Sequence, residues 1–379
     1  MNRLPDFLFP YVQITSLDKL PQPEEGTDLI GRYAFLYLDF TQVPEYALGH
    51  TFVDCCFFGC KLLEEQFNRA QDCLTFPKMN MVFKAYREDL YTPETLYEGY
   101  APGKKGTYQE CYDYKVYHDY QEKGTHCLNL KVMLARSLHD HSVYDAMVSF
   151  LIRETLGDLS RCIGIMGGHG LKRKDKGFWN IVRISKELTE KGYLMISGGG
   201  PGAMEATHLG AWMAGRSWDE TVDAAVRLAK AGEDNPEKWL ESAFDIRERY
   251  PQQEYKSLSI PTWLYGHEPS TPLATHIAKY FTNSVREDMI LSVALGGIIF
   301  TPGSAGTMQE VFQNAAKVHY DVMGKSGPMV FLGVDFFTKD IPVYPFLKDL
   351  IERKRYSNMK IRITDDAQEA IEMVTAKKK

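Results

Sequence analysis

Two glycine-rich segments in the second half of the chain combine free backbone N–H groups with side chains capable of acid–base chemistry. The first runs from Ser197 to Glu205 (SGGGPGAME) and the second from Pro302 to Glu310 (PGSAGTMQE). Each follows an apolar run and precedes a helical pattern, so each predicts a loop between a strand and a helix. Glycines there permit positive φ, and the start of a helix offers unpaired N–H groups to an anion. We therefore expect both loops to bind an anion.

The first loop has neither the spaced glycines of the dinucleotide fingerprint nor the Gly-Lys-Ser/Thr of a P-loop. The alternative to a binding loop is an ordinary tight turn. A shorter glycine segment, Gly167-Gly168-His169, follows the apolar run Cys162–Met166 in the same way. The candidate binding residues of these segments are Gly167, Gly168, His169, Ser197, Gly198, Gly199, Gly200, Gly202, Met204 and Glu205.

The second loop adds hydroxyl groups and a carboxylate to its N–H groups. Residues 303–307 can form a nest of N–H groups, and we take Gly303, Ser304, Ala305, Gly306 and Thr307 as candidate phosphate ligands. Glu310 is expected on the first turn of the helix, where it could face the same anion. A glutamate is also common near a helix start for electrostatic reasons alone.

A third candidate is Arg286, within a predicted helix that precedes the next strand. It lies one helix-and-strand length before Glu310, so that both side chains could approach one pocket. An arginine beside the acids Glu287 and Asp288 is also typical of a solvated helix face.

The composition excludes several classes of protein. The 379 residues are 44% hydrophobic and 25% charged, which fits a folded globular chain longer than one domain requires. The formal net charge of −6 argues against general nucleic-acid binding. We find no apolar run long enough to span a membrane and no signal peptide. Seven scattered cysteines fit reduced thiols, so we expect a cytoplasmic location.

Composition also suggests a boundary near residue 150. Residues 1–150 hold 14 of the 22 tyrosines but only 8 of the 30 glycines. We predict a small α+β region of unknown role over 1–150, without an internal repeat, and a second domain over 151–379. In the second domain, strands are expected at 162–166, 193–197, 259–265, 297–301, 329–332 and 359–364. Helices are expected between them, including a long one over 274–294. This alternation predicts an α/β fold with a Rossmann-like doubly wound parallel sheet.

These motifs resemble the LOG family of nucleotide phosphoribohydrolases, often labelled lysine decarboxylases. The loop at Gly198-Gly199-Gly200 is similar to that family's glycine-rich loop, and Pro302 to Glu310 is similar to its Pro-Gly-Gly-x-Gly-Thr-x-x-Glu motif. The segments 167–169 and 200–206, together with Glu268-Pro269 and Pro272, look like the bacterial purine/pyrimidine nucleotide 5′-monophosphate nucleosidase branch. The resemblance covers roughly residues 160–335.

The resemblance implies that Arg286 and Glu310 are the catalytic pair. This chain departs from the family pattern at three positions. Ser304 replaces a glycine, Gln309 replaces a common acid, and Glu287 stands where many members have a basic residue. We expect no cofactor and no metal. Pyridoxal phosphate chemistry needs a lysine that neither loop contains, and Cys56 and Cys60 lack a matching Cys/His pair.

The expected function is hydrolysis of nucleoside 5′-monophosphates to free base and ribose 5-phosphate. The expected partner is therefore the nucleoside monophosphate substrate, with neither nucleic acid nor a membrane. Two alternatives remain: a nucleotide-binding sensor without hydrolysis, and a narrower enzyme that releases a modified adenine, as in cytokinin activation. Members of the resembled family are at least dimers, and we expect a homo-oligomer.

Overall fold

A computed structural model describes residues 11–232, 235–265, 269–322, 324 and 326–376. The chain divides into two compact units. Unit 1 contains residues up to Asp89 and residues His126–Ser149, and unit 2 contains Leu90–Thr125 and Phe150–Lys379. Helix α5 (Leu130–Thr155) therefore contributes residues to both. None of the helices in the described part of the chain is long and apolar enough to cross a membrane.

Unit 2 contains a seven-stranded sheet in which every pair of neighbouring strands is parallel, in the order β10-β9-β8-β7-β11-β12-β13. The predicted Rossmann-like doubly wound fold is thereby confirmed. The strands are β7 (Cys162–Met166), β8 (Leu194–Ser197), β9 (Ser257–Ser259), β10 (His276–Ile277), β11 (Gly297–Phe300), β12 (Met329–Leu332) and β13 (Ile361–Thr364). The central strands β7, β8, β11 and β12 are buried along their whole length, as expected for a parallel sheet covered on both faces.

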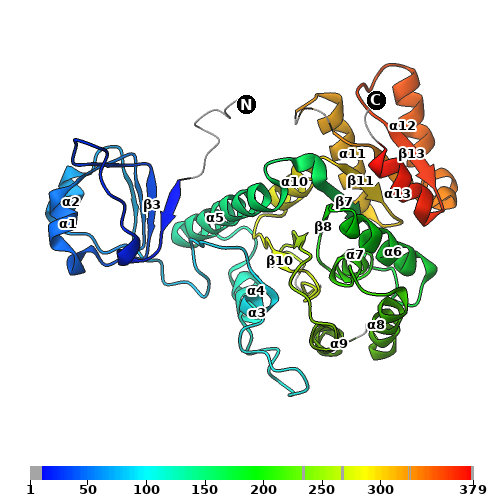
Figure 1. The fold of residues 1–379 in the computed structure, drawn as a ribbon, viewed down its shortest axis with the longest axis horizontal. Helices are drawn as coiled ribbons and strands as arrows, with labels where there is room; N and C mark the ends of the chain where they lie inside the picture. Colours follow the sequence, from blue (N-terminus) through cyan, green and yellow to red (C-terminus); the bar gives the residue numbers. More distant parts are fainter. Residues whose placement is uncertain (1–10, 233–234, 266–268, 323, 325, 377–379) are drawn as a thin grey trace. The chain divides into compact units, whose positions relative to one another are not determined.

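Helices cover both faces of this sheet (Figure 1). On one face α6 (Lys176–Glu190) packs against α7 (Ala203–Trp212) and α13 (Ala367–Thr375). On the other, α10 (Asn283–Val293) packs against α11 (Ala305–His319), whose Phe312 contacts Phe346 of α12 (Val343–Glu352). Two further helices, α8 (Trp218–Ala231) and α9 (Pro236–Arg249), pack on each other. The strand order reverses between β7 and β11, which is where open α/β sheets bind ligands.

Two of the predicted elements differ from the structure. In place of the strand predicted over 259–265, β9 covers Ser257–Ser259, and it ends there because the following Pro261 has no N–H to donate to a ladder. The helix predicted over 274–294 begins only at Asn283. The residues before it are extended because Ile277 pairs with Ser259 of β9 and exchanges two backbone hydrogen bonds with Tyr91, at 2.8 and 3.0 Å. Tertiary pairing outweighs the local helical preference there.

The segment Leu90–Thr125, which includes α3 (Pro93–Leu96) and α4 (Tyr112–Lys123), belongs to unit 2. The predicted boundary near residue 150 had placed it in the N-terminal region. A buried carboxylate explains the attachment. Asp113 accepts hydrogen bonds from Trp263 Nε1 at 2.9 Å and from Lys279 Nζ at 2.7 Å. Leaving that carboxylate buried without these donors would be strongly unfavourable, so the segment is held to the sheet edge.

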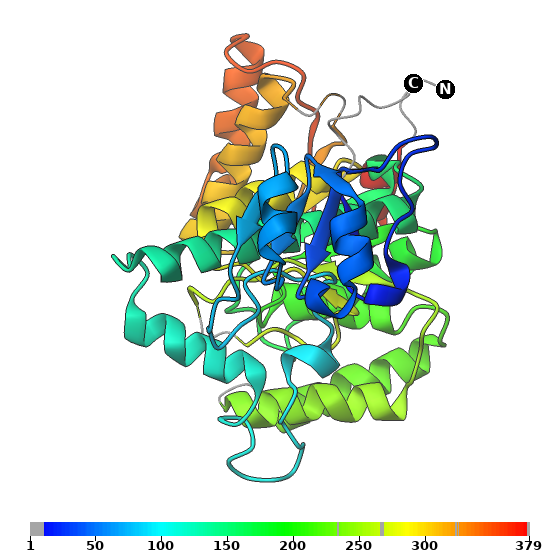
Figure 2. The same cartoon turned by 90° about the vertical axis from the view of Figure 1, so that its left-hand side faces the viewer.

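Unit 1 combines short parallel strands with helices, and its turns repeat. Strands β1 (Val12–Ile14), β3 (Tyr33–Leu36), β5 (Cys56–Phe58) and β6 (Leu74–Phe76) form one sheet in chain order. Strands β2 (Leu29–Gly31) and β4 (Thr51–Val53) form a second. Helices α1 (Pro44–Gly49) and α2 (Glu64–Arg69) lie to one side of the strands (Figures 1 and 2). Ala34 pairs with Cys56 and Cys56 with Leu74, so successive turns are 22 and 18 residues long.

The repeat, which we did not find in the sequence, is visible in the backbone of each turn. Arg32, Asp54 and Asp72 occupy equivalent corners, and all three have positive φ, at 63°, 50° and 52°. Such stacked turns form a solenoid, in which each turn packs mainly on its neighbours. The 20-residue period is disguised because the segments between strands differ in length and sequence.

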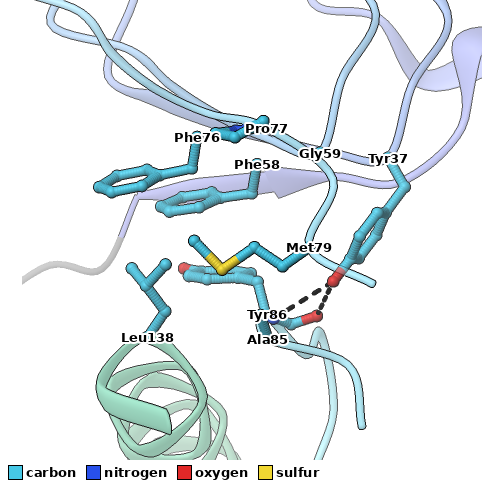
Figure 3. Close-up of a pocket in the computed structure, with 9 residues that line it drawn as sticks. All are labelled: Tyr37, Phe58, Gly59, Phe76, Pro77, Met79, Ala85, Tyr86 and Leu138. Carbon is cyan, nitrogen blue, oxygen red and sulfur yellow. Dashed lines mark hydrogen bonds between the residues drawn. The ribbon is translucent and has the colours of Figure 1, made fainter. Parts of the chain in front are cut away.

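Aromatic rings stack from turn to turn inside the solenoid and on one outer face of its strands. Inside, Phe35 stacks on Phe57 with ring centroids 5.1 Å apart. On the outer face, Phe76, Phe58 and Tyr86 stack in that order, with centroid distances of 5.4 and 3.9 Å (Figure 3). The Tyr37 hydroxyl donates to Tyr86 O at 3.1 Å and accepts from Tyr86 N at 3.2 Å, which fixes the loop over this face.

We expect Phe57→Ala to destabilise unit 1 by about 3–5 kcal/mol, because it removes a fully buried ring that also contacts Phe40 and Phe52. Hydrogen exchange of the amides in residues 33–76, followed by mass spectrometry, measures this change. Leu74→Ala is the matched control, since Leu74 is 57% exposed and its loss should change the opening free energy by less than about 0.5 kcal/mol. If the amides exchanged at the same rate in the two variants, the conclusion that Phe57 belongs to the core of the solenoid would be wrong.

Candidate functional site

The candidate site lies at the carboxyl ends of β7 and β11, where three glycine-containing loops meet. Gly168 N donates to Pro302 O at 3.0 Å, which joins the loop after β7 to the loop after β11. A Cβ added at Gly167 would collide with Thr301 Oγ1, and one at Gly303 with Thr307 Oγ1. Glycine is therefore needed at both positions for the two loops to approach this closely.

The loop after β8 approaches the same place. Gly202 has a φ of 73°, and a Cβ there would lie 2.6 Å from Gly168 O. Gly199 has a φ of 83° and leaves room for the Ser259 side chain, while a Cβ at Gly198 would collide with the guanidinium of Arg286. The bare backbone at Gly198 is thus what allows Arg286 to enter the site.

Arg286 and Glu310 meet at this point, from α10 and α11. Arg286 Nη1 lies 3.6 Å from Glu310 Oε1, and Arg286 Nε donates to Ile260 O at 2.7 Å. Both residues are 8% exposed. The hydrogen bond to Ile260 O, just after β9, fixes the orientation of the guanidinium. Arg286 and Glu310 thus lie close together, as their spacing in the sequence suggested.

Burial changes the acidity of Glu310. It raises the pKa of this carboxyl to about 7, against the opposing effect of the Arg286 charge, and the negative charge of Glu287 raises it further. A carboxyl with a pKa near neutrality exchanges protons readily at physiological pH, which suits a general acid or base.

Glu287 is a second buried carboxylate in the site, held by two side-chain amides. Asn283 Nδ2 donates to Glu287 Oε1 at 2.8 Å, and Gln309 Nε2 donates to Oε2. Glu287 and Gln309 are two of the positions at which the sequence departs from the pattern of the resembled family. The structure shows that these two residues bond to each other.

A cavity of about 310 Å³ opens beside these groups, at the lower end of the range for small-molecule sites. It is lined by Gly167, Gly168, His169, Met204, Tyr265, Arg286, Glu287, Ser304, Gly306, Thr307 and Glu310. The N–H groups at the start of α11, a helix of 15 residues, adjoin this wall and provide the positive end of its dipole. The cavity therefore combines the positive end of a helix dipole with a carboxyl of raised pKa.

Nine of the residues predicted from the sequence line this cavity, and eight do not. Gly198, Gly199, Gly200, Gly202 and Gly303 belong to the loops that shape it, and Ala305 is exposed at the start of α11. Ser197 is fully buried, and its hydroxyl donates to Ile165 O at 2.7 Å. The resemblance at Glu268 falls outside the described residues.

Glu205 has a different environment from the one its motif suggested. Its carboxylate binds Arg173 through two contacts, Nε to Oε2 at 2.8 Å and Nη2 to Oε1 at 2.5 Å, and both side chains are almost fully buried. Arg173 also donates to Leu228 O at 2.8 Å, Gly232 O at 3.1 Å and Ser242 Oγ at 3.1 Å. The pair thus connects α7 to the region of α8 and α9.

Two cavity residues were not among the predicted site residues. Glu287 follows Arg286 in the sequence. It stands where many members of the resembled family have a basic residue, and this difference could have marked it as a site residue. Tyr265 is 42% exposed and gave no signal, because it lay at the end of a stretch predicted to be a strand.

No protein-family model and no curated protein matches this chain. Two of the solved structures that match are a molybdenum cofactor binding protein from Rippkaea orientalis and a structural-genomics target named TM1055. The first is 15% identical, covering 57% of this chain and 95% of its own, and the second is 19% identical, covering 56% and 97%. Each has a TM-score of 0.36.

Glu205→Gln should destabilise unit 2 by about 3–5 kcal/mol, because it leaves the Arg173 charge buried without its counter-ion. Chemical denaturation followed by circular dichroism measures the loss. Glu248→Gln, at an exposed glutamate of α9, is the control and should be neutral within about 0.5 kcal/mol. If the stability of the Glu205 variant were unchanged, the structural role of the Arg173–Glu205 pair would be contradicted, and ligand binding by Glu205 would again be the better explanation.

Glu287→Gln should lower the pKa of Glu310, because it removes a negative charge that disfavours ionisation. Carbon-13 NMR of glutamate carboxyl groups across a pH series measures this pKa, and the signal missing from Glu310→Gln assigns the resonance. In the wild type the resonance should titrate near pH 7, and in the Glu287 variant at a lower pH. A pKa that stays the same or rises would show that Glu287 does not act on Glu310.

Proposed function

We propose that this protein hydrolyses the N-glycosidic bond of nucleoside 5′-monophosphates, releasing the free base and ribose 5-phosphate. The buried Arg286–Glu310 pair at the switch point of the sheet, facing the glycine-rich loops, is the observation that carries the proposal. The similarity of both loops to those of the LOG family supports the same activity.

The chemistry required matches the groups in the cavity. Breaking the bond between ribose and base develops positive charge at the anomeric carbon, and a carboxylate beside that carbon stabilises it. Glu310, with its pKa near neutrality, can also accept a proton from the attacking water. The water oxygen then bonds to the anomeric carbon while the bonding electrons leave with the base, which takes up a proton.

The remaining cavity groups position the substrate. The N–H groups at the start of α11 and the hydroxyls of Ser304 and Thr307 suit the 5′-phosphate. Arg286 cannot rotate freely, because its Nε is bonded to Ile260 O. Its charge is therefore held ready for the substrate and at the same time favours the ionised form of Glu310. Tyr265 also lines the cavity and is an aromatic residue on which a nucleobase can stack.

Incubation with a panel of nucleoside 5′-monophosphates and the matching nucleosides tests the proposal, with free base and ribose 5-phosphate as the readout. Monophosphates should be cleaved far faster than nucleosides, because the loops bind the phosphate. Glu310→Gln should reduce turnover by at least about 10²-fold while nucleotide binding, measured by calorimetry, largely persists.

Two results would reject parts of this scheme. Cleavage of adenosine as fast as AMP would contradict phosphate binding by the loops. Tight nucleotide binding without any base release by the wild type would favour the alternative of a non-hydrolytic sensor. Glu248→Gln serves again as a control that leaves the cavity unchanged.

A further inference from the structure

Two cysteines occupy equivalent places in neighbouring turns of the unit 1 solenoid. Cys55 and Cys73 each follow a corner residue of positive φ, Asp54 and Asp72. The next residues, Cys56 and Leu74, are paired Cα partners of parallel strands. Paired strands lie about 4.8 Å apart, which is within the range of roughly 4.4–6.8 Å that a disulfide spans between Cα atoms. The backbone spacing thus permits a bond between these two residues.

The two side chains lie next to each other in the core of the solenoid. Cys55 N donates to Cys73 Sγ at 3.4 Å, and both side chains belong to the same cluster of packed apolar residues. Each thiol also donates to the preceding turn, Cys55 to Ile30 O at 3.3 Å and Cys73 to Phe52 O at 3.5 Å. These hydrogen bonds fix the side-chain conformation of both cysteines.

The two thiols differ in reactivity. Cys55 is buried, whereas Cys73 is only partly buried and so is open to a small reagent. Hydrogen bonding to Cys55 lowers the pKa of the Cys73 thiol to about 7, whereas the interaction with Cys73, together with burial, raises the pKa of Cys55. Because the thiolate is the reactive form, Cys73 is the expected nucleophile.

We propose that Cys55 and Cys73 form a redox-sensitive pair, which a hydroperoxide converts to a disulfide linking two turns of the solenoid. The Cys73 sulfur attacks one peroxide oxygen and the O–O bond breaks, giving a sulfenic acid and, after uptake of a proton, an alcohol or water. The Cys55 sulfur then attacks the sulfenic sulfur. The S–O bond breaks, and the oxygen leaves as water with the Cys55 proton. The two thiols together lose two electrons, and these electrons reduce one hydroperoxide molecule.

The other cysteines of these turns are less suited to the reaction. Burial raises the pKa of both Cys56 and Cys60 to about 11. The Cys60 thiol donates to Phe35 O at 3.3 Å, a backbone acceptor in the preceding turn. Cys60 resembles Cys55 in its setting and differs in having no hydrogen bond to Cys73 among those described, so it provides the matched control.

The experiment treats the full-length chain with hydrogen peroxide, blocks the remaining thiols with N-ethylmaleimide and digests it with trypsin without reduction. Cleavage after Arg32, Lys61, Arg69 and Lys78 leaves Cys73 alone in peptide 70–78 and Cys55 in peptide 33–61. We expect these peptides to be joined, with fragmentation placing the link at Cys55. Thiols titrated in denaturant should fall from seven to five and return to seven after dithiothreitol.

Variants identify the order of the steps. Cys60→Ser should still form the link, and Cys73→Ser should not. Cys55→Ser should leave Cys73 as a sulfenic acid that dimedone labels. A wild-type chain whose Cys73 is unlinked after oxidation, or is joined to Cys56, Cys60 or another chain, would overturn the proposal. Because the wild-type result needs no substitution, this test stands even where a variant fails to fold.

Discussion

The site depends on one steric constraint: three loops must touch where their backbones carry no side chains. Gly167 and Gly303 bring the ends of β7 and β11 together, and Gly202 seats the loop after β8 against them. Gly198 then leaves the space that the Arg286 guanidinium fills. Without this contact, the arginine of α10 and the glutamate of α11 would each be buried without the other. The glycines are thus required for charge pairing as much as for turn geometry.

The pKa of Glu310 in the cavity is set by its burial and by the charges of a few neighbouring side chains. Arg286 opposes the effect of burial on Glu310, and Glu287 reinforces it. Glu287 accepts hydrogen bonds from the side-chain amides of Asn283 and Gln309, which satisfy its oxygens without cancelling its charge. A basic residue in place of Glu287 would change the sign of its effect on Glu310. The amide at Gln309 is consistent with this arrangement, since a carboxylate there would face Glu287 as a like charge.

Much of the second domain was predictable because its signals are local. Buried parallel strands such as Cys162–Met166 are continuous apolar runs, and glycines mark the loops after them. Other features required non-local contacts. Residues 274–282 have helical composition, but Ile277 among them pairs with Tyr91, 186 residues earlier in the chain. The role of Glu205 depends on Arg173, which lies in a loop without a motif. The solenoid of unit 1 was not predicted because its repeat is weak in the sequence. The equivalent positions Arg32, Asp54 and Asp72 all have positive φ but are not all the same residue type.

The division of the chain has a consequence for its biosynthesis. The polypeptide leaves unit 1 after Asp89, returns at His126 and leaves again after Ser149, within the continuous helix α5. No single truncation therefore separates the two units. During translation the solenoid emerges first, but it acquires its own last residues only after the first segment of unit 2 has been made. That segment, in turn, contacts Trp263, Ile277 and Lys279, which are synthesised later. Each unit therefore begins folding while a part of it is still to be synthesised.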